Sequence, residues 1–290
     1  MPFHRSRSVP LWRNGSTPSG CTVVGPRTMT RTAANIRGMA HVRTDAREGV
    51  AVEGRRPHGW GDDRLAAFLN LASDNVLGTF ALLRDEYDRL RRIDDAFVDF
   101  TDNLLNPLDP IAPLLMLQAH ASYRAAAELA MTCQSAPAFM AMRGCVESSL
   151  YGLYFHRNPN TFEVWARRHD DDAARQAVRA EFTIRRLRDC LAAVDPATAN
   201  SVANLYDKTI DFGAHPNVAA LAGAFRTEDD EQRRQFKVIY LTADPVMIRG
   251  TMKSVAQTGL ASLLIFRNVF IERFNLLGII ERLTELRRGL

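Results

Sequence analysis

The chain has 290 residues, 46% of them hydrophobic and 24% charged, which is enough apolar material for one large domain or two small ones. Its net charge of +4 is unevenly spread. Residues 1 to 58 hold ten arginines against three acidic residues, a net of +7, so the remaining 232 residues carry −3. The body of the chain therefore lacks the overall basic character of a dedicated nucleic-acid-binding domain.

Residues 1 to 58 mix Arg, Pro, Gly, Ser and Thr with little periodicity. Such a composition buries too little apolar surface to offset the entropy of ordering, so we predict a disordered tail and one domain over residues 59 to 290. Three alternatives remain for the tail. It resembles an organellar transit peptide, it could precede a true start at Met29 or Met39, or it could be a basic arm that contacts nucleic acid or acidic lipid.

A long amphipathic helix is predicted from about Asp62, because apolar residues recur at three-four spacing across eight turns. Its apolar positions are Val76, Phe80, Leu83, Tyr87, Leu90, Ile93, Phe97, Phe100 and Leu104. Asn106-Pro107 and Asp109-Pro110 stop this helix, and the second pair opens another that we expect to reach about Cys133.

A central helix is predicted over Pro137 to His156, a stretch with only two formal charges, Arg143 and Glu147. One stripe is apolar, a second is made of small residues that admit close neighbours, and Ser135 is expected to cap the helix. A third stripe holds Arg143, Glu147, Tyr151 and Tyr154. The two ions, four residues apart, either neutralise each other inside the bundle or line a cleft open to water and a ligand.

The rest of the chain is predicted to be helical with one exception. We expect a charged helix over 170 to 194, a helix from Asp195-Pro196 to Gly213, a short apolar helix over 218 to 225, a long helix over 244 to 274 and a short one from Leu276. The segment 236 to 241, FKVIYL, is strand-like but has no evident partner, so we interpret it as an extended or helical linker. As a strand it could pair only across a dimer or with the GVAV stretch of the tail. The fold class is thus all-α, a multi-helix bundle of seven to nine helices.

No C-x-x-C pair and no secretory apolar region accompany the cysteines, which favours a reducing, cytoplasmic compartment and cysteines that fill the core. They are Cys21, Cys133, Cys145 and Cys190. The apolar run between Lys253 and Arg267 has 13 residues, too few to cross a bilayer, so no membrane span is predicted.

His215 is a candidate for chemistry, because it sits at a helix-breaking turn, His215-Pro216-Asn217, and follows Lys208 and Asp211. The alternative is that it only caps the preceding helix. The pattern R-x-x-x-E-x-x-x-Y of the central helix followed by a His-Pro-Asn turn resembles uncharacterised bacterial helical proteins allied to the HEPN superfamily. The resemblance covers about residues 110 to 220.

Many HEPN proteins resemble metal-independent ribonucleases of toxin or phage-defence systems, with an Arg four to six residues before a His. This chain departs from that pattern, since only Lys208 offers a cation near that spacing, and lysine lacks the bidentate fork of arginine. The resemblance implies His215, Lys208, Arg143 and Glu147 as catalytic candidates. The ligand-binding candidates are Tyr151, Asp211 and Asn217.

We predict a cytoplasmic helical binding or scaffold protein that self-associates as a homo-oligomer, with no metal and no cofactor. The rival hypothesis is a metal-independent ribonuclease or nucleotide-handling enzyme. Under these two hypotheses the expected partners are RNA or another protein.

Overall fold

In the computed structural model, the described residues are 58–104, 111–214, 218, 221, 225–230 and 233–290. All described residues belong to one compact unit. The predicted tail lies outside the described residues except for His58. The candidate site residues His215 and Asn217 also lie outside them.

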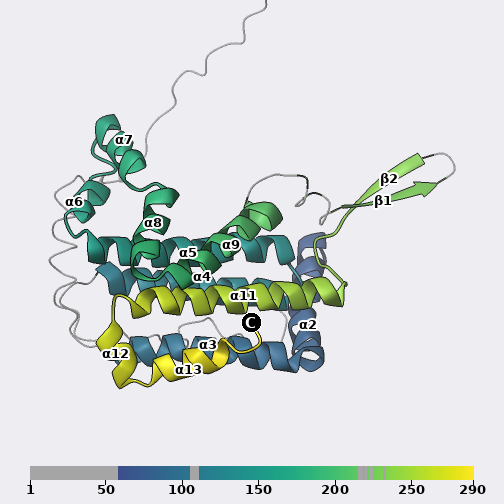
Figure 1. The fold of residues 1–290 in the computed structure, drawn as a ribbon. Coiled ribbons are helices and arrows are strands. Elements are labelled where there is room, and N and C mark those ends of the chain that lie inside the picture. The colour runs from purple at the N-terminus through teal and green to yellow at the C-terminus, as the bar shows by residue number, and fades with distance from the viewer. Residues whose placement is uncertain (1–57, 105–110, 215–217, 219–220, 222–224, 231–232) are drawn as a thin grey trace, which may run out of the picture. The chain divides into compact units, whose positions relative to one another are not determined.

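The described part is helical apart from one hairpin, which confirms the predicted all-α fold class (Figure 1). Its elements in chain order are α2 (Arg64–Leu82), α3 (Arg84–Asp102), α4 (Ile111–Met131), α5 (Ser135–Arg157), α6 (Thr161–Ala166), α7 (Asp172–Glu181), α8 (Ile184–Val194), α9 (Pro196–Thr209), the π-helical turn η1 (Ile210–Ala214), β1 (Phe225–Asp230), β2 (Arg233–Val238), α11 (Pro245–Arg267), α12 (Ile271–Leu276) and α13 (Ile279–Leu286).

Helix α5 is central, as its sequence predicts. It packs on α4 and α11, and α8, α9 and η1 cover its remaining side. Its first half belongs to one hydrophobic cluster with α3, α4, α11 and α13, and its second half to another with α7, α8 and α9. Burial of both halves explains why the helix carries so few charges.

The small residues of α5 lie where neighbouring helices come closest. A side chain at Gly144 would meet Ser122 of α4 at 3.2 Å, and one at Gly152 would meet the Phe266 ring of α11 at 2.7 Å. Between them, the Ser149 and Ser262 hydroxyls are hydrogen-bonded at 2.6 Å in the interior. The prediction that this stripe admits close neighbours is confirmed.

The long helix predicted from Asp62 is wrong in one respect, because it breaks at Leu83 into α2 and α3. Leu83 leaves the helical region with φ −125° and ψ 51°. Thr79 Oγ1 donates to the Met131 carbonyl at 3.0 Å, which holds α2 at the end of α4, whereas α3 runs along α11 and α13. The three-four spacing of apolar residues continues through the break because Leu83, which is 6% exposed, is itself part of the core.

Three other boundaries differ from the predictions. Ser135 is the first residue of α5 rather than its cap, and its hydroxyl accepts a hydrogen bond from Thr251 Oγ1 at 3.0 Å. The charged helix splits at Phe182, whose ring is buried in an aromatic cluster, and Thr183 caps α8 by accepting from the Arg186 amide. The long C-terminal helix ends at Arg267, before α12.

The segment 236–241 was interpreted as a linker, and this is wrong for its first part. Strand β2 pairs antiparallel with β1, with Phe225 opposite Val238 and Thr227 opposite Phe236. The partner strand is the polar stretch just upstream. Its sequence does not indicate a strand, because strand propensity mostly reflects packing against neighbours and the side chains of this hairpin are exposed.

Helix α2 was not singled out by its sequence, yet it is long and apolar enough to cross a bilayer by length and composition. Its most apolar window has a mean hydropathy of 1.3, and 17% of that window is buried. The expectation of no membrane span considered only the run before Arg267, so for α2 it stays a prediction.

Candidate ligand-binding pocket

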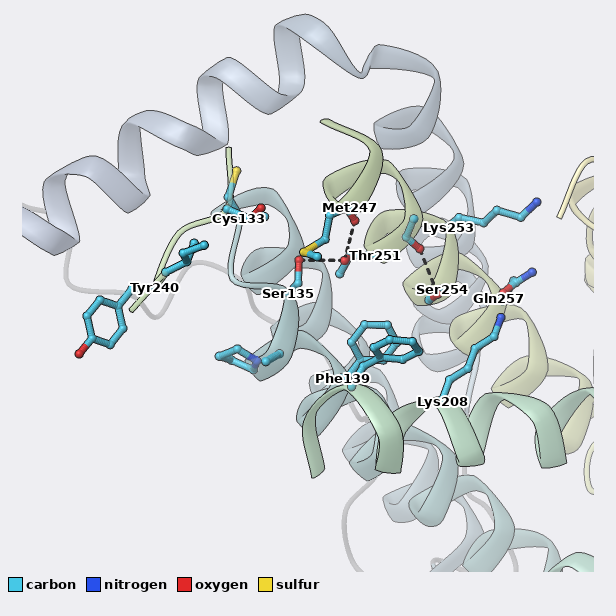
Figure 2. A pocket seen from close by; sticks show the side chains of 16 residues that line it. Cys133, Ser135, Phe139, Lys208, Tyr240, Met247, Thr251, Lys253, Ser254 and Gln257 are labelled. Carbon is cyan, nitrogen blue, oxygen red and sulfur yellow. Dashed lines mark hydrogen bonds between the residues drawn. The ribbon is translucent and has the colours of Figure 1, made fainter. Parts of the chain in front are cut away.

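A pocket of about 440 Å³ opens where four segments meet: the start of α5, the end of α9 with η1, the stretch after β2, and the first half of α11 (Figure 2). This volume is within the range of small-molecule sites, roughly 300–1,000 Å³. The start of α5 contributes Ser135, Ala136, Pro137 and Phe139 to the lining. Thr242 N donates to the Cys133 carbonyl at 2.9 Å, which ties the stretch after β2 to the turn that precedes α5.

The π-helical turn builds one wall of the pocket. After Thr209 the helix widens, and η1 carries Phe212 against Phe139 with ring centroids 5.3 Å apart. Gly213 permits this approach, because a Cβ there would overlap the Ala136 carbonyl oxygen and lie 2.9 Å from the Phe139 Cβ. The glycine was predicted to end the helix, whereas η1 continues through it. π-Turns within helices are frequent at functional sites.

Most of the described pocket lining is apolar, and the hydroxyls of Thr251 and Ser254 donate within the protein. Thr251 Oγ1 donates to Ser135 Oγ and to the Met247 carbonyl, and Ser254 Oγ donates to the Gly250 carbonyl at 3.0 Å. Gly250 itself faces open space, since a Cβ built there meets nothing within 4 Å. The apolar lining residues are Cys133, Ala136, Pro137, Phe139, Phe212, Ile239, Tyr240 and Met247.

Polar groups gather at one end, where Lys208 of α9 and Lys253 and Gln257 of α11 lie far from Tyr240 (Figure 2). Both lysines are exposed. No Asp or Glu is among the described lining residues, and neither lysine forms an ion pair with another described residue. The chain contains 34 arginines and only three lysines. Two of these three lysines, Lys208 and Lys253, line this pocket.

The polar end continues into a second hollow of about 280 Å³, which shares Lys208 and Gln257 with the first. Arg287 lines this second hollow, and Gln257 Nε2 donates to the Leu290 carbonyl at 3.3 Å. The charged side chains among the described lining residues of the two hollows are therefore all cations, Lys208, Lys253 and Arg287, a setting that favours an anionic group.

Two of the predicted catalytic residues form a cluster that is not part of the described pocket lining. Arg143 Nε donates to Glu147 Oε1 at 2.8 Å, and the Tyr206 hydroxyl of α9 donates to the same oxygen at 2.9 Å. The Arg143 guanidinium also lies 5.0 Å from the Tyr206 ring centroid, a cation–π contact. The expectation that the two ions pair is confirmed, with side chains 26% and 37% exposed.

The electrostatics of this cluster keep Arg143 charged and Tyr206 protonated. Burial tends to lower the pKa of Arg143, but the hydrogen bond to Glu147, the Glu147 charge and Tyr206 together outweigh burial and raise the pKa. Burial, followed by the Glu147 charge, raises the pKa of Tyr206 to about 12. Tyr206 therefore keeps its proton and remains a donor at neutral pH.

The two other predicted site residues that the structure describes, Tyr151 and Asp211, are not in the described pocket lining. Tyr151 stacks on Phe182 with centroids 5.4 Å apart, and Asp211 is exposed on η1. Among the predicted site residues within the described part of the chain, Lys208 is the one that lines the pocket. Lys253 was missed, although the scarcity of lysine in the chain was a signal that the sequence offered.

Cys145 is fully buried, as predicted for a core residue. Burial raises its pKa to about 12, with a hydrogen bond from Ser262 opposing the rise, so its thiol is inert as a nucleophile. Among the residues that the structure describes, no group of three or more His, Cys, Asp or Glu side chains could hold a metal ion.

Comparisons of the chain with protein-family models, with curated proteins and with solved structures found no match. The resemblance to HEPN proteins and the ribonuclease hypothesis therefore stay predictions, and both depend on His215.

Proposed function

We propose that this protein binds a small amphipathic anion, with an apolar body in the 440 Å³ pocket and a carboxylate or phosphate at Lys208 and Lys253. The observation that carries the proposal is the placing of two of the three lysines, without a described acidic partner, at one end of an apolar pocket.

The two parts of the site contribute differently to binding. Removing apolar ligand surface from water is worth about 25 cal/mol per Å², so the apolar wall would supply most of the affinity. An exposed lysine paired with an anion contributes only about 0.2–1 kcal/mol. The lysines would therefore select for an acidic end group and orient the ligand.

Binding is favoured over catalysis by the chemistry of the lining. The described lining residues include neither a carboxylate nor an imidazole, the groups that most often take a proton at neutral pH. A pre-formed, mostly apolar pocket with a few polar groups at one end is typical of a ligand-binding site.

Calorimetry with three probes that share one apolar body tests the proposal: dodecanoate, dodecyl phosphate and neutral dodecanol. Gly250→Leu should weaken binding of all three, because Gly250 lines the pocket and a Cβ there meets nothing within 4 Å, so the added side chain takes up space at the pocket wall. Lys208→Met with Lys253→Met should weaken the two anions about tenfold and leave dodecanol unchanged.

Lys237→Met is the matched control, since Lys237 lies on β2 and not in the described pocket lining. It should leave all three affinities unchanged. The proposal fails if Gly250→Leu binds the probes as well as wild type, or if dodecanol and dodecanoate respond alike to the lysine substitutions.

A further inference from the structure

The second hollow, of about 280 Å³, differs from the first in the chemistry of its walls. One face of α9 and one face of α11 build most of it, because the lining residues of each helix recur at three- and four-residue spacing. The polar lining of α9 includes Ser201, Asn204 and Lys208. The apolar lining of α11 is Leu260, Ala261 and Leu264. The hollow therefore offers hydrogen bonds on one side and apolar packing on the other.

Two polar groups of this hollow are available to a ligand. Arg287, just after α13, and Asn204 are both exposed, and neither side chain forms a hydrogen bond or an ion pair with another residue that the structure describes. A guanidinium presents paired N–H groups that match the two oxygens of a carboxylate, whereas a lysine ammonium acts as a point charge. Arg287 is thus suited to a carboxylate, and Asn204 to an amide or hydroxyl beside it.

The two hollows are arranged in sequence along one path. They share Lys208 and Gln257, whereas Lys253 lines only the first and Arg287 only the second. Tyr240 lies at the opposite end of the first hollow from the lysines (Figure 2). A ligand with its apolar body toward Tyr240 and an anion at Lys208 therefore directs its headgroup into the second hollow. A single anion would leave part of the positive charge of these three cations uncompensated, since no Asp or Glu is in the described lining of either hollow.

We infer that the second hollow binds the headgroup of the ligand, and that this ligand is a single-chain amphiphile with two anionic groups. One anion lies at Lys208 and Lys253, and a carboxylate lies at Arg287. The inference rests on the proposed function and narrows its ligand class. At about 30 Å³ for each water, 280 Å³ holds roughly nine waters, which is room for a headgroup of the size of an amino acid.

Calorimetry of the full-length chain with N-dodecanoyl-glutamate and N-dodecanoyl-glutamine tests the inference, because these probes share one shape and differ by one charge. Wild type should bind the glutamate probe about fivefold more tightly, the upper end of what one exposed ion pair contributes. Arg287→Met should make the two affinities equal. Lys208→Met with Lys253→Met should weaken both probes by the same factor, because both carry the anion that these lysines bind.

Arg288→Met is the matched control, since Arg288 is the adjacent exposed arginine and is outside the described lining of both hollows. It should keep the fivefold preference. Asn204→Trp adds bulk to the second hollow, so it should weaken both acyl amino acids and leave dodecanol unchanged, because a neutral chain needs only the first hollow. All three side chains are exposed, and circular dichroism should show an intact fold in each variant.

Two results would overturn the inference and leave the proposed function standing. One is equal binding of the two acyl amino acids to wild type, or a preference that survives Arg287→Met. The other is binding of dodecanoate without binding of either acyl amino acid, since the second hollow would then accept no headgroup. If dodecanoate, dodecyl phosphate and both acyl amino acids all fail to bind, the proposed function is wrong and the inference falls with it.

Discussion

The pair formed by Arg143 and Glu147 should stabilise the protein much less than a buried ion pair, and a double-mutant cycle measures the difference. The side chains are 26% and 37% exposed, so solvent screens their attraction. An exposed pair contributes about 0.2–1 kcal/mol, whereas removing one partner of a fully buried pair costs about 3–5 kcal/mol.

The structure predicts unequal costs for the two single substitutions. Arg143→Met removes one partner of a half-exposed pair and should cost about 1 kcal/mol. Glu147→Leu also removes the acceptor of the Tyr206 hydroxyl. Because Tyr206 is only 4% exposed, losing this hydrogen bond should bring the cost of Glu147→Leu to about 2 kcal/mol. Adding Tyr206→Phe should reduce the cost of Glu147→Leu to about 1 kcal/mol.

Urea unfolding at pH 7 measures these free energies. The coupling energy between Arg143→Met and Glu147→Leu should be about 0.5–1 kcal/mol. Equal costs for the two single substitutions, or a cost of Glu147→Leu that Tyr206→Phe does not change, would refute the reasoning.

Two further predictions concern the Asp94 carboxylate on α3 and the glycine in η1. His120 Nε2 lies 2.6 Å from Asp94 Oδ1, and Arg124 donates to both oxygens of Asp94. Burial tends to raise the pKa of Asp94, but the bonds from Arg124 and His120 outweigh it and hold the pKa well below its usual range. Because the folded pKa is depressed, this stabilisation is present above the unfolded pKa of about 4 and is lost as the pH falls below it. The free energy of unfolding of Asp94→Asn should therefore be about 2 kcal/mol lower than that of wild type at pH 7, and the difference should be smaller at pH 3. Urea unfolding that gives the same difference at both pH values would contradict this. Gly213→Ala should cost about 1–3 kcal/mol because its Cβ overlaps the Ala136 carbonyl, whereas Gly250→Ala should not destabilise; equal melting temperatures for both variants would contradict the proposed packing of η1.

The helices with strong local signals could be predicted from the sequence. The apolar stripe and small residues of α5 indicated a helix covered on several sides, and Asp195-Pro196 and Asp244-Pro245 do open α9 and α11. The break at Leu83 could not be predicted, because the apolar spacing is the same on both sides and the bend depends on contacts between α2 and the end of α4.

The pocket was beyond prediction for a related reason. It joins α5, α9, α11 and the stretch after β2, and no periodicity relates residues in separate segments. Lys208 was chosen from the sequence for its spacing from His215, but the structure brings it near Lys253, 45 positions later in the chain. The exposure of α2 was hidden as well, since an apolar helix resembles a core helix until its neighbours are known.

The most direct test of the proposed function uses the scarcity of lysine. An amine-reactive label followed by peptide mass spectrometry reports on Lys208, Lys253 and Lys237 separately in one sample of the full-length protein. With dodecanoate bound, labelling of Lys208 and Lys253 should fall several-fold while that of Lys237 stays constant, and dodecanol should protect neither pocket lysine to the same degree. Uniform labelling of all three lysines with dodecanoate at saturation would contradict the assignment of this pocket as an anion-binding site.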